Sequence, residues 1–236
     1  MSDQPDKHLA EKRIAATRAA EEIADGMVVG LGSGSTAILA LDAIAARMAK
    51  GLRIVGIPTS EATAARATAL GIPLTDFSRH RRIDVTIDGA DQVAHGTLDL
   101  VKGRGGALLR EKIVASASAR MIVVIDETKL VSQLGGAMPL PLEIVRFGWE
   151  LLLERLAAAG YPAALRRRGG EAVLSDNGNY LADCTIPAIS DPAALERRLS
   201  GMLGVIATGL FIGMAAKVIV GQAAGTRTIE PSRPVR

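Results

Sequence analysis

Cysteine and histidine are scarce in this chain of 236 residues. Cys184 is the only cysteine, so no disulfide can form within the chain, and such cysteine usage is typical of a reducing cytoplasm. The three histidines, His8, His80 and His95, lie far apart without the spacing of metal ligands, which argues against structural zinc and predicts no metal site. A chain of this length can bury a real core without such cross-links.

Two further shortages limit the partners of the chain. Phe, Tyr and Trp make up 3% of the residues, which leaves few platforms on which single-stranded nucleic acid could stack. The formal net charge of +3 at pH 7 is far from the concentrated Lys and Arg field of nucleic-acid-binding proteins. We therefore predict no nucleic-acid partner. The small positive excess suits small anionic substrates, although compositional bias explains it equally well.

Long apolar segments are also missing. No segment reaches the roughly 18 uninterrupted apolar residues that mark a membrane span. Residues 1–13 contain no apolar core of a signal peptide. We therefore expect a soluble, cytoplasmic protein without a membrane partner.

The chain does contain short apolar runs that alternate with Ala-rich, amphipathic segments. The run 27–31 is wholly apolar, which is typical of a strand buried on both faces of a parallel sheet. The whole pattern predicts helices over 7–23, 37–48, 61–70 and 107–118 and strands over 27–31, 53–57, 84–87 and 121–126. This alternation favours a Rossmann-like, doubly wound, mainly parallel α/β sheet.

The pattern changes after Leu134, where GGAMPLPLEIV brings two prolines and two glycines. From Leu142 onward the expected order is β-α-β-β-α-β, the arrangement of a ferredoxin-like α+β domain. The elements predicted here are a helix over 147–159, strands over 163–168 and 180–186, a helix over 192–200 and a strand over 205–211. We predict an α/β catalytic domain formed by residues 1–134 and 207–236, a smaller α+β domain over 135–206, a strand at 216–220 that returns to the first sheet, and a loosely ordered tail over 231–236.

The segment GLGSGST, residues 30–36, lies between an apolar strand and a helix. Backbone N–H groups at a helix start, glycines without side-chain bulk and the hydroxyls of Ser33, Ser35 and Thr36 suit a phosphate. The Walker lysine and the last glycine of G-x-G-x-x-G are missing, so neither a P-loop nor a dinucleotide fingerprint is present. A turn that only caps the helix is the alternative.

Polar residues also follow two predicted strands. Asp88 and Asp91 of DGAD come directly after the strand 84–87, where carboxylates point into the ligand crevice of α/β proteins and can hold sugar hydroxyls. An Asx turn at Asp88 and a cap at Asp91 are an equally good interpretation. Lys129 follows the strand 121–126 and is a candidate second partner for phosphate or an oxyanion, or else a surface loop lysine.

The segment VKGRGGALLREK, residues 101–112, places a lysine and a glutamate around a glycine cluster. Lys102 is a cation able to stabilise an oxyanion, and Glu111 is a carboxylate able to shuttle a proton. Enolisation beside a carbonyl requires these two functions. The alternative for Glu111, which lies between Arg110 and Lys112, is a solvated helix face.

In this order, GLGSGST, DGAD, KGRGGALLREK and VIDETK resemble the motifs of ribose-5-phosphate isomerase of the A type. The resemblance continues through PLPLEIV (139–145), SDNGN (175–179) and TGLF (208–211), so it covers nearly the whole chain. The chain departs from the family pattern at Arg104, which interrupts the glycine run, and at Ser33, where threonine is more common. It also departs at Gln92, where an acid is common.

The resemblance implies interconversion of D-ribose 5-phosphate and D-ribulose 5-phosphate through an enediolate, in the non-oxidative pentose phosphate pathway, without a metal or an organic cofactor. It implies that Glu111 transfers the proton, that Lys102 stabilises the oxyanion, and that Asp88 and Asp91 bind hydroxyls and assist ring opening. We expect Glu111 beside Lys102 to be ionised at neutral pH. The substrate-binding residues that the resemblance implies are Lys12, Ser33, Gly34, Ser35, Thr36, Asp88, Gly89, Ala90, Asp91, Lys102, Gly103, Arg104, Gly105 and Lys129.

Other functions fit parts of the pattern. A sugar-phosphate-sensing regulator on a related scaffold is one, but the first 26 residues hold a single predicted helix, too little for a helix-turn-helix. A related amino-sugar phosphate deaminase or CoA transferase is another, since a shared fold does not define a function. The pair Lys102 and Glu111 favours the isomerase. Apolar segments in the second domain lead us to expect a homodimer or homotetramer.

Overall fold

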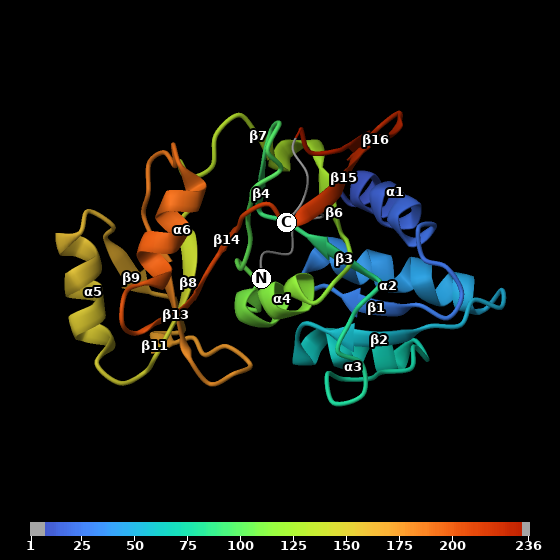
Figure 1. Ribbon diagram of the computed structural model, residues 1–236, viewed down its shortest axis with the longest axis horizontal. Helices are drawn as coiled ribbons and strands as arrows, with labels where there is room; N and C mark the ends of the chain where they lie inside the picture. Colours follow the sequence, from blue (N-terminus) through green and yellow to red (C-terminus); the bar gives the residue numbers. More distant parts are fainter. Residues whose placement is uncertain (1–7, 233–236) are drawn as a thin grey trace.

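The computed structural model describes residues 8–232, which form an α/β unit beside a smaller α+β unit (Figure 1). Residue 7 of the first predicted helix and residues 233–236 of the predicted tail lie outside the described residues. The larger unit is on the right in Figure 1, and the smaller one, with α5 and α6, is on the left.

A six-stranded sheet of order β16-β15-β6-β3-β1-β2 forms the larger unit. All neighbouring strands pair in parallel except β16, which is antiparallel to β15 at the edge. The strands are β1 (Val28–Leu31), β2 (Val55–Pro58), β3 (Val85–Gly89), β6 (Met121–Asp126), β15 (Ala215–Gln222) and β16 (Gly225–Ile229). The predicted Rossmann-like, mainly parallel sheet is confirmed, and the predicted strand 216–220 returns to it as β15.

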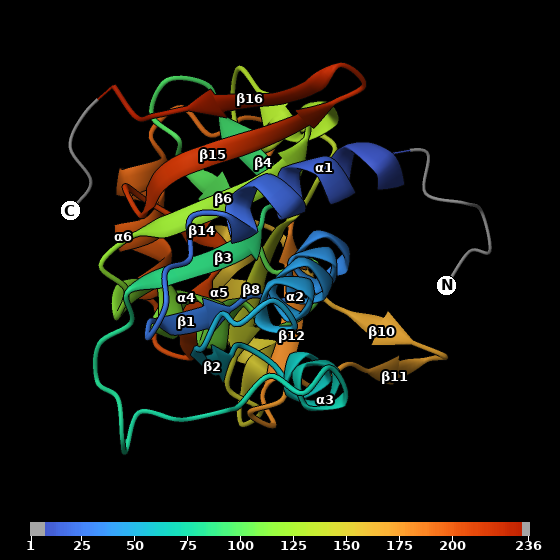
Figure 2. The same cartoon turned by 90° about the vertical axis from the view of Figure 1, so that its right-hand side faces the viewer.

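Helical and looped layers cover both faces of this sheet because its inner strands are apolar on both faces. Side chains alternate along β6, so that Ile122 and Val124 pack with α1 and α2 while Val123 packs in the opposite layer. Three helices share the first face (Figure 2): α1 (Leu9–Ala20), α2 (Ser35–Met48) and α3 (Glu61–Ala69). α4 (Leu108–Ser116) lies on the second face, next to the smaller unit (Figure 1).

The smaller unit is built on a four-stranded antiparallel sheet of order β13-β8-β12-β9. Its elements are β8 (Leu140–Ile144), α5 (Trp149–Ala158), β9 (Ala163–Leu165), β12 (Tyr180–Cys184), α6 (Pro192–Ser200) and β13 (Val205–Thr208). Asp191 caps α6 by accepting a hydrogen bond from the Ala194 N–H, and Pro192 begins the helix. The order β-α-β-β-α-β confirms the predicted ferredoxin-like arrangement.

Strand β8 has two different faces because side chains alternate along a strand. Leu142 and Ile144 are buried in the core under α5 and α6. Pro141 and Glu143 lie on the opposite face, and Pro141 lies against Gly103 in the loop before α4. The smaller unit therefore packs against the segment 101–112, which contains Lys102 and Glu111.

A small third sheet of order β14-β5-β4-β7 was not predicted as such. Its strands are β4 (Gln92–Ala94), β5 (Leu100–Val101), β7 (Leu130–Val131) and β14 (Leu210–Phe211).

The predicted strand 205–211 is wrong as one strand, because it is divided at Gly209 into β13 and β14. A Cβ on Gly209 would lie 2.3 Å from the Lys102 carbonyl oxygen, so only glycine allows the chain to pass there.

A second predicted strand is also divided. The strand 163–168 separates into β9 and β10 (Arg167–Arg168), and β10 pairs with β11 (Glu171–Ala172) in a projecting hairpin (Figure 2). The strand 205–211 crosses the predicted domain boundary, and β13 of the smaller sheet continues to Thr208. The division into domains at 134/135 and 206/207 remains our proposal.

Candidate active site

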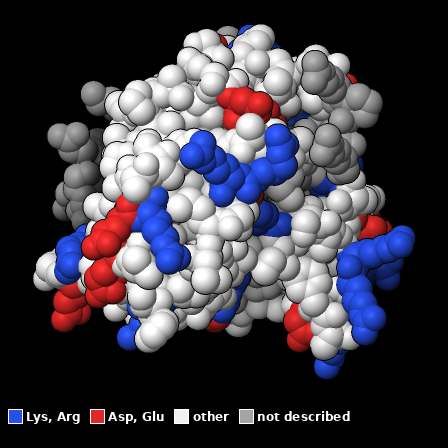
Figure 3. Space-filling view, turned by 60° about the vertical axis from the view of Figure 1, so that its left-hand side comes forward, with Lys and Arg blue, Asp and Glu red and all other residues white. Residues whose placement is uncertain are grey.

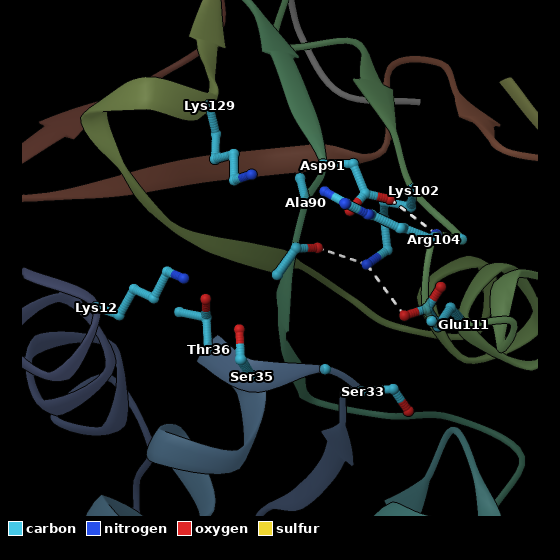
Figure 4. A pocket seen from close by; sticks show the side chains of 14 residues that line it. Lys12, Ser33, Ser35, Thr36, Ala90, Asp91, Lys102, Arg104, Glu111 and Lys129 are labelled. Atoms are coloured by element: carbon cyan, nitrogen blue, oxygen red, sulfur yellow. Dashed lines mark hydrogen bonds and ion pairs between the residues drawn. The ribbon is translucent and has the colours of Figure 1, made fainter. Parts of the chain in front are cut away.

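A cavity of about 310 Å³ lies at the C-terminal ends of β1, β3 and β6, where ligands bind in sheets of this kind (Figure 4). The cavity contains every predicted substrate-binding residue except Asp88, together with Glu111. Its lining consists of Lys12, Ser33, Gly34, Ser35, Thr36, Gly89, Ala90, Asp91, Lys102, Gly103, Arg104, Gly105, Glu111 and Lys129.

One end of the cavity is formed by the start of α2. Gly34 has φ 90° and ψ 177°, a backbone conformation that favours glycine, and no side chain of residues 8–232 caps this helix. The first N–H groups of α2 therefore remain available for an anion, and the helix dipole favours negative charge there. Ser35 is exposed and Thr36 is next to it (Figure 4).

Two lysines face this helix start from other elements (Figure 4). Lys12 comes from α1, and its Nζ lies 3.8 Å from Oδ2 of Asp126, the buried last residue of β6. Oδ1 of the same Asp126 accepts a 3.0 Å hydrogen bond from the Thr128 N–H and so caps the short 3-10 helix η1 (Glu127–Lys129). One buried carboxylate thus helps to place both Lys12 and Lys129.

Ser33 lines the cavity but its hydroxyl is already in use. Its Oγ lies 2.7 Å from Thr59 Oγ1, 2.8 Å from Ser60 Oγ and 3.0 Å from Thr63 Oγ1, at the start of α3. In Figure 4 its side chain lies apart from those of Ser35 and Thr36. The sequence did not show this, because the hydroxyl cluster brings together residues far apart in the chain.

Lys102 occupies the other end of the cavity, directly after β5. Its Nζ lies 3.0 Å from Asp88 Oδ2 and 3.3 Å from Glu111 Oε1, and it donates a hydrogen bond to the Gly89 carbonyl. It also lies over the Phe211 ring, 5.6 Å from its centroid. The lysine side chain is 3% exposed, so its position is determined by these contacts.

Asp88 lies under this lysine rather than in the cavity lining. It is fully buried, and its Oδ1 accepts hydrogen bonds from the Ser33 N–H at 3.0 Å and the Gly89 N–H at 2.8 Å. A Cβ on Gly32 would lie 2.2 Å from the same oxygen, so glycine is required there. Asp88 therefore links the loop after β1 to Lys102.

Glu111 lies in the first turn of α4 and is 5% exposed, so the alternative of a solvated helix face is wrong. Its Oε1 is the ion-pair partner of Lys102. Its Oε2 is buried and has no hydrogen-bond partner among the described residues. One oxygen of this carboxylate is therefore held by the lysine, while the other has no such partner among residues 8–232 (Figure 4).

The charges at this end are unbalanced, since Asp88, Asp91 and Glu111 surround one ammonium. Burial, with a smaller contribution from Asp88, raises the pKa of Glu111 to about 8, although Lys102 acts to lower it. Burial also raises the pKa of Asp88 against the effect of Lys102. Burial alone would lower the pKa of Lys102, but Asp88 and Glu111 raise it above its ordinary value.

The expectation that Glu111 is ionised at neutral pH stays a prediction, and the raised pKa of the buried carboxyl group opposes it. The lysine favours the ionised form as expected, but burial and the neighbouring carboxylates outweigh it. Neither contribution can be measured from the spacing of the residues.

Asp91 and Arg104 separate this cavity from a second one of about 510 Å³. The Arg104 N–H donates a 2.9 Å hydrogen bond to Asp91 Oδ2, and Arg166 Nη1 donates a 2.8 Å hydrogen bond to the Arg104 carbonyl. The exposed guanidinium of Arg104 extends across the sugar end toward Ala90 and Asp91 (Figure 4). The Arg104 backbone thus has fixed partners on both sides.

Sequence reasoning missed three residues that shape the site: Gly32, Gly209 and Phe211. Gly209 and Phe211 belong to TGLF, which contributed to the family resemblance but had no assigned role. Gly32 was only part of the phosphate segment. The Gly209 carbonyl accepts a 2.8 Å hydrogen bond from the Lys102 N–H. No local pattern indicates this contact, because it arises where the chain leaves the sheet of β13 and enters the sheet of β14.

The described residues form neither a membrane-spanning helix nor a metal-binding group. Residues 8–232 include no helix long and apolar enough to cross a membrane. The same part of the chain holds no group of three or more His, Cys, Asp and Glu residues arranged to bind a metal ion.

Comparison with known proteins decides the family. A family model described as ribose 5-phosphate isomerase A (phosphoriboisomerase A) matches residues 55–225. The chain is 52% identical over 221 residues to ribose-5-phosphate isomerase A of Gloeobacter violaceus, which covers 94% of this chain and 96% of that protein. The chain belongs to the ribose 5-phosphate isomerase A family.

Further relatives agree with this assignment. Ribose-5-phosphate isomerase A of Gluconobacter oxydans is 48% identical over 222 residues, or 93% of this chain and 96% of that protein. The solved structure of ribose 5-phosphate isomerase A from Methanocaldococcus jannaschii superimposes with a TM-score of 0.91 at 34% identity, covering 95% of this chain and 100% of that one. As a family member the chain is an isomerase of the pentose phosphate pathway, and the sensor, deaminase and CoA transferase alternatives have no support.

Proposed function

We propose that this chain interconverts D-ribose 5-phosphate and D-ribulose 5-phosphate by proton transfer between C2 and C1. The observation that carries the proposal is the buried pair at the base of the cavity, with Lys102 Nζ 3.3 Å from Glu111 Oε1 and Glu111 Oε2 without a partner among the described residues. A positioned base beside a fixed cation is what enolisation next to a carbonyl needs.

Glu111 is the base in this proposal. Its Oε2 removes the proton from C2 of the open-chain aldose, and the electron pair shifts to give an enediolate. The same carboxyl group returns the proton to C1, while the hydroxyl proton moves from O2 to O1. Atoms and electrons balance within the substrate, so the reaction needs no oxidant or reductant.

Lys102 stabilises the oxyanion on the carbonyl oxygen. Its ammonium is buried and held by Asp88 and Glu111 before substrate arrives, so no solvent reorganisation is required at that moment. Asp88 supports the reaction through Lys102, since its carboxylate does not line the cavity. Asp91 lines the cavity and binds sugar hydroxyls during ring opening.

The phosphate binds at the opposite end. The uncapped N–H groups of α2, the hydroxyls of Ser35 and Thr36, and the ammonium groups of Lys12 and Lys129 supply its contacts. The Ser33 hydroxyl does not take part, because the cluster at α3 holds it. One solved relative, a D-ribose-5-phosphate isomerase in complex with phospho-erythronic acid, has a TM-score of 0.89 and 38% identity to this chain, covering 93% of this chain and 97% of that one. A sugar-acid phosphate bound to a relative supports a sugar-phosphate ligand here.

The deciding experiment incubates the purified protein, stripped with a chelator, with ribose 5-phosphate and follows ketose formation. We expect full activity without added metal or cofactor. We also expect Glu111→Gln to reduce kcat by about 10²–10⁴-fold, the usual contribution of a positioned general base. An inactive wild type would refute the proposed reaction, and a glutamine variant with most of its turnover would refute the assignment of the base.

Self-association and location are also proposals. The second unit exposes large apolar side chains, with Phe147 95% and Leu203 85% exposed, which supports a homodimer or homotetramer. The face in Figure 3 is largely uncharged, and its basic side chains form separate groups beside acidic ones. This distribution supports a small-molecule substrate rather than nucleic acid. The single cysteine supports a cytoplasmic location.

A further inference from the structure

We propose that Arg110 and Lys112, the neighbours of Glu111, are positioning residues that use the second unit to set the rotation of α4 and so place the Glu111 carboxylate. This inference rests on the proposed function. Both residues were part of the solvated-face interpretation of the sequence, and neither lines the cavity.

α4 needs external support because it is short. It has nine residues, and no described side chain caps its N-terminus at Ala107. Isolated helices of fewer than about 12–15 residues are marginal in water. The orientation of Glu111 must therefore come from contacts that α4 makes with its surroundings.

Arg110 is bound to the loop 175–179, the SDNGN motif of the smaller unit. Its Nε donates a 2.9 Å hydrogen bond to Asn177 Oδ1, and its Nη2 donates one of 3.1 Å to the Asp176 carbonyl. Its Nη1 lies 2.7 Å from Glu61 Oε1 at the start of α3. Three planar contacts from one guanidinium define a direction as well as a distance.

The loop that holds Arg110 is itself anchored on a buried carboxylate. Glu143 of β8 is fully buried, and its Oε1 accepts hydrogen bonds from Ser175 Oγ at 2.8 Å, Asn177 Nδ2 at 3.0 Å and Asn179 Nδ2 at 2.8 Å. Asn177 thus joins Glu143 to Arg110. The motifs PLPLEIV and SDNGN, which the proposed chemistry does not use, meet at this point.

Lys112 is held by a different part of the same unit. Its Nζ lies 2.7 Å from Glu196 Oε1 on α6, and Glu196 Oε2 accepts a hydrogen bond from the Thr208 hydroxyl of β13. The ammonium also lies 5.2 Å from the centroid of the Phe211 ring, which Lys102 contacts as well. The contacts that hold Lys112 therefore lie close to Lys102, because both lysines contact the Phe211 ring.

The geometry of a helix explains why these two neighbours matter. Successive residues are separated by about 100° around the axis, so Arg110 and Lys112 lie on either side of Glu111. Attachments on both sides resist rotation in both directions. With side-chain tips at roughly 6 Å from the axis, a rotation of about 10° displaces a carboxylate by about 1 Å. A displacement of that size can reduce a rate by roughly 10²-fold.

The test compares Arg110→Ala and Lys112→Met with the wild type. We expect each to lower kcat by about 10-fold or more while KM stays within about twofold, because the base and not the binding contacts has moved. The pH at which kcat/KM is half-maximal should also fall, since burial is the main cause of the raised pKa of Glu111. Arg66→Ala is the matched control: Arg66 joins α3 to Asp42 of α2 at 2.5 Å and is 43% exposed. It should leave both parameters nearly unchanged.

The outcomes are distinguishable. Wild-type kcat and an unchanged pH profile in both variants would overturn this inference and leave the proposed function intact. A change confined to KM would recast the two residues as binding residues and also overturn it. An inactive wild type would refute the proposed function instead. Thermal unfolding identifies a variant that does not fold, and since the two attachments are separate, the other variant still decides the question.

Discussion

At the phosphate end of the cavity Ser35 is exposed and the first N–H groups of α2 have no cap among the described residues. At the sugar end, by contrast, Lys102 and Glu111 are buried and bonded to each other. The phosphate end is formed by the turn before α2, with Lys12 from α1 and Lys129 from η1. The sugar end is formed by hydrogen bonds and ion pairs among side chains of β3, the loop before α4 and α4 itself, which in turn contacts the smaller unit.

The difference shows how binding and chemistry are divided within one small cavity. A phosphate carries its charge throughout the reaction, so contacts with it stabilise the ground state and the transition state equally. The enediolate carries its charge only during the reaction, so the groups that meet it are most effective when they are fixed in advance. Changes at the sugar end should alter kcat, and changes at the phosphate end should alter KM.

After Glu111→Gln, the replacement of the buried lysine should have the largest effect on kcat. Lys102→Ala removes the oxyanion partner and leaves Asp88 and Glu111 facing each other without a cation. We expect kcat to fall by about 10²–10³-fold, the usual cost of one oxyanion contact. Initial rates over a range of ribose 5-phosphate concentrations measure it. A change confined to KM would show that the two ends are not divided as described.

The pH dependence should reveal the raised pKa of the base. Glu111 must be ionised to accept a proton, and its pKa in the free protein is raised to about 8. kcat/KM should therefore decline by about tenfold per pH unit below that value, or about 100-fold over two units. Rates in overlapping buffers of constant ionic strength test this. A flat profile down to pH 6 would mean that the pKa of Glu111 is not raised, and hence that its carboxylate is less buried than the structure indicates.

At the phosphate end, Lys12→Ala should raise KM by about 10- to 150-fold, because a charge-assisted hydrogen bond contributes about 1.5–3 kcal/mol. We expect kcat to change by less than about twofold, since that contact is equal in the ground and transition states. Steady-state kinetics separate the two parameters. Inorganic phosphate should also inhibit the variant more weakly than the wild type. A large loss of kcat would remove the distinction between the two ends.

The smallest effect is expected at Arg104, which lies at the border of the sugar end and the second cavity. Arg104→Gly restores the glycine run of the family pattern while the backbone bond to Asp91 remains possible. We expect KM to change by about two- to threefold, since one exposed contact contributes about 1 kcal/mol or less. A 100-fold loss of kcat would place Arg104 among the groups that act on the enediolate.

Much of this architecture was predictable because it is encoded locally. The turn after β1, the carboxylates at the end of β3 and the lysine and glutamate around the glycines each lie within about ten residues of one another. The β-α-β-β-α-β order also follows from apolar periodicity. β5, β7 and β14 have two residues each, too few for any period to be recognised. β16 is largely exposed, so its apolar signal is weak.

The sequence by itself determined the α/β sheet, the α+β arrangement, the phosphate turn and the candidate residues, since strand and helix patterns and turn glycines act over short distances. Tertiary structure alone decided that the Ser33 hydroxyl is engaged elsewhere, that Asp88 lies beneath Lys102 and that Glu111 has a raised pKa. It also decided that Arg110 and Lys112 reach the second unit. These facts depend on burial and on distances between residues remote in the chain, and desolvation of a charge is a property of the assembled fold.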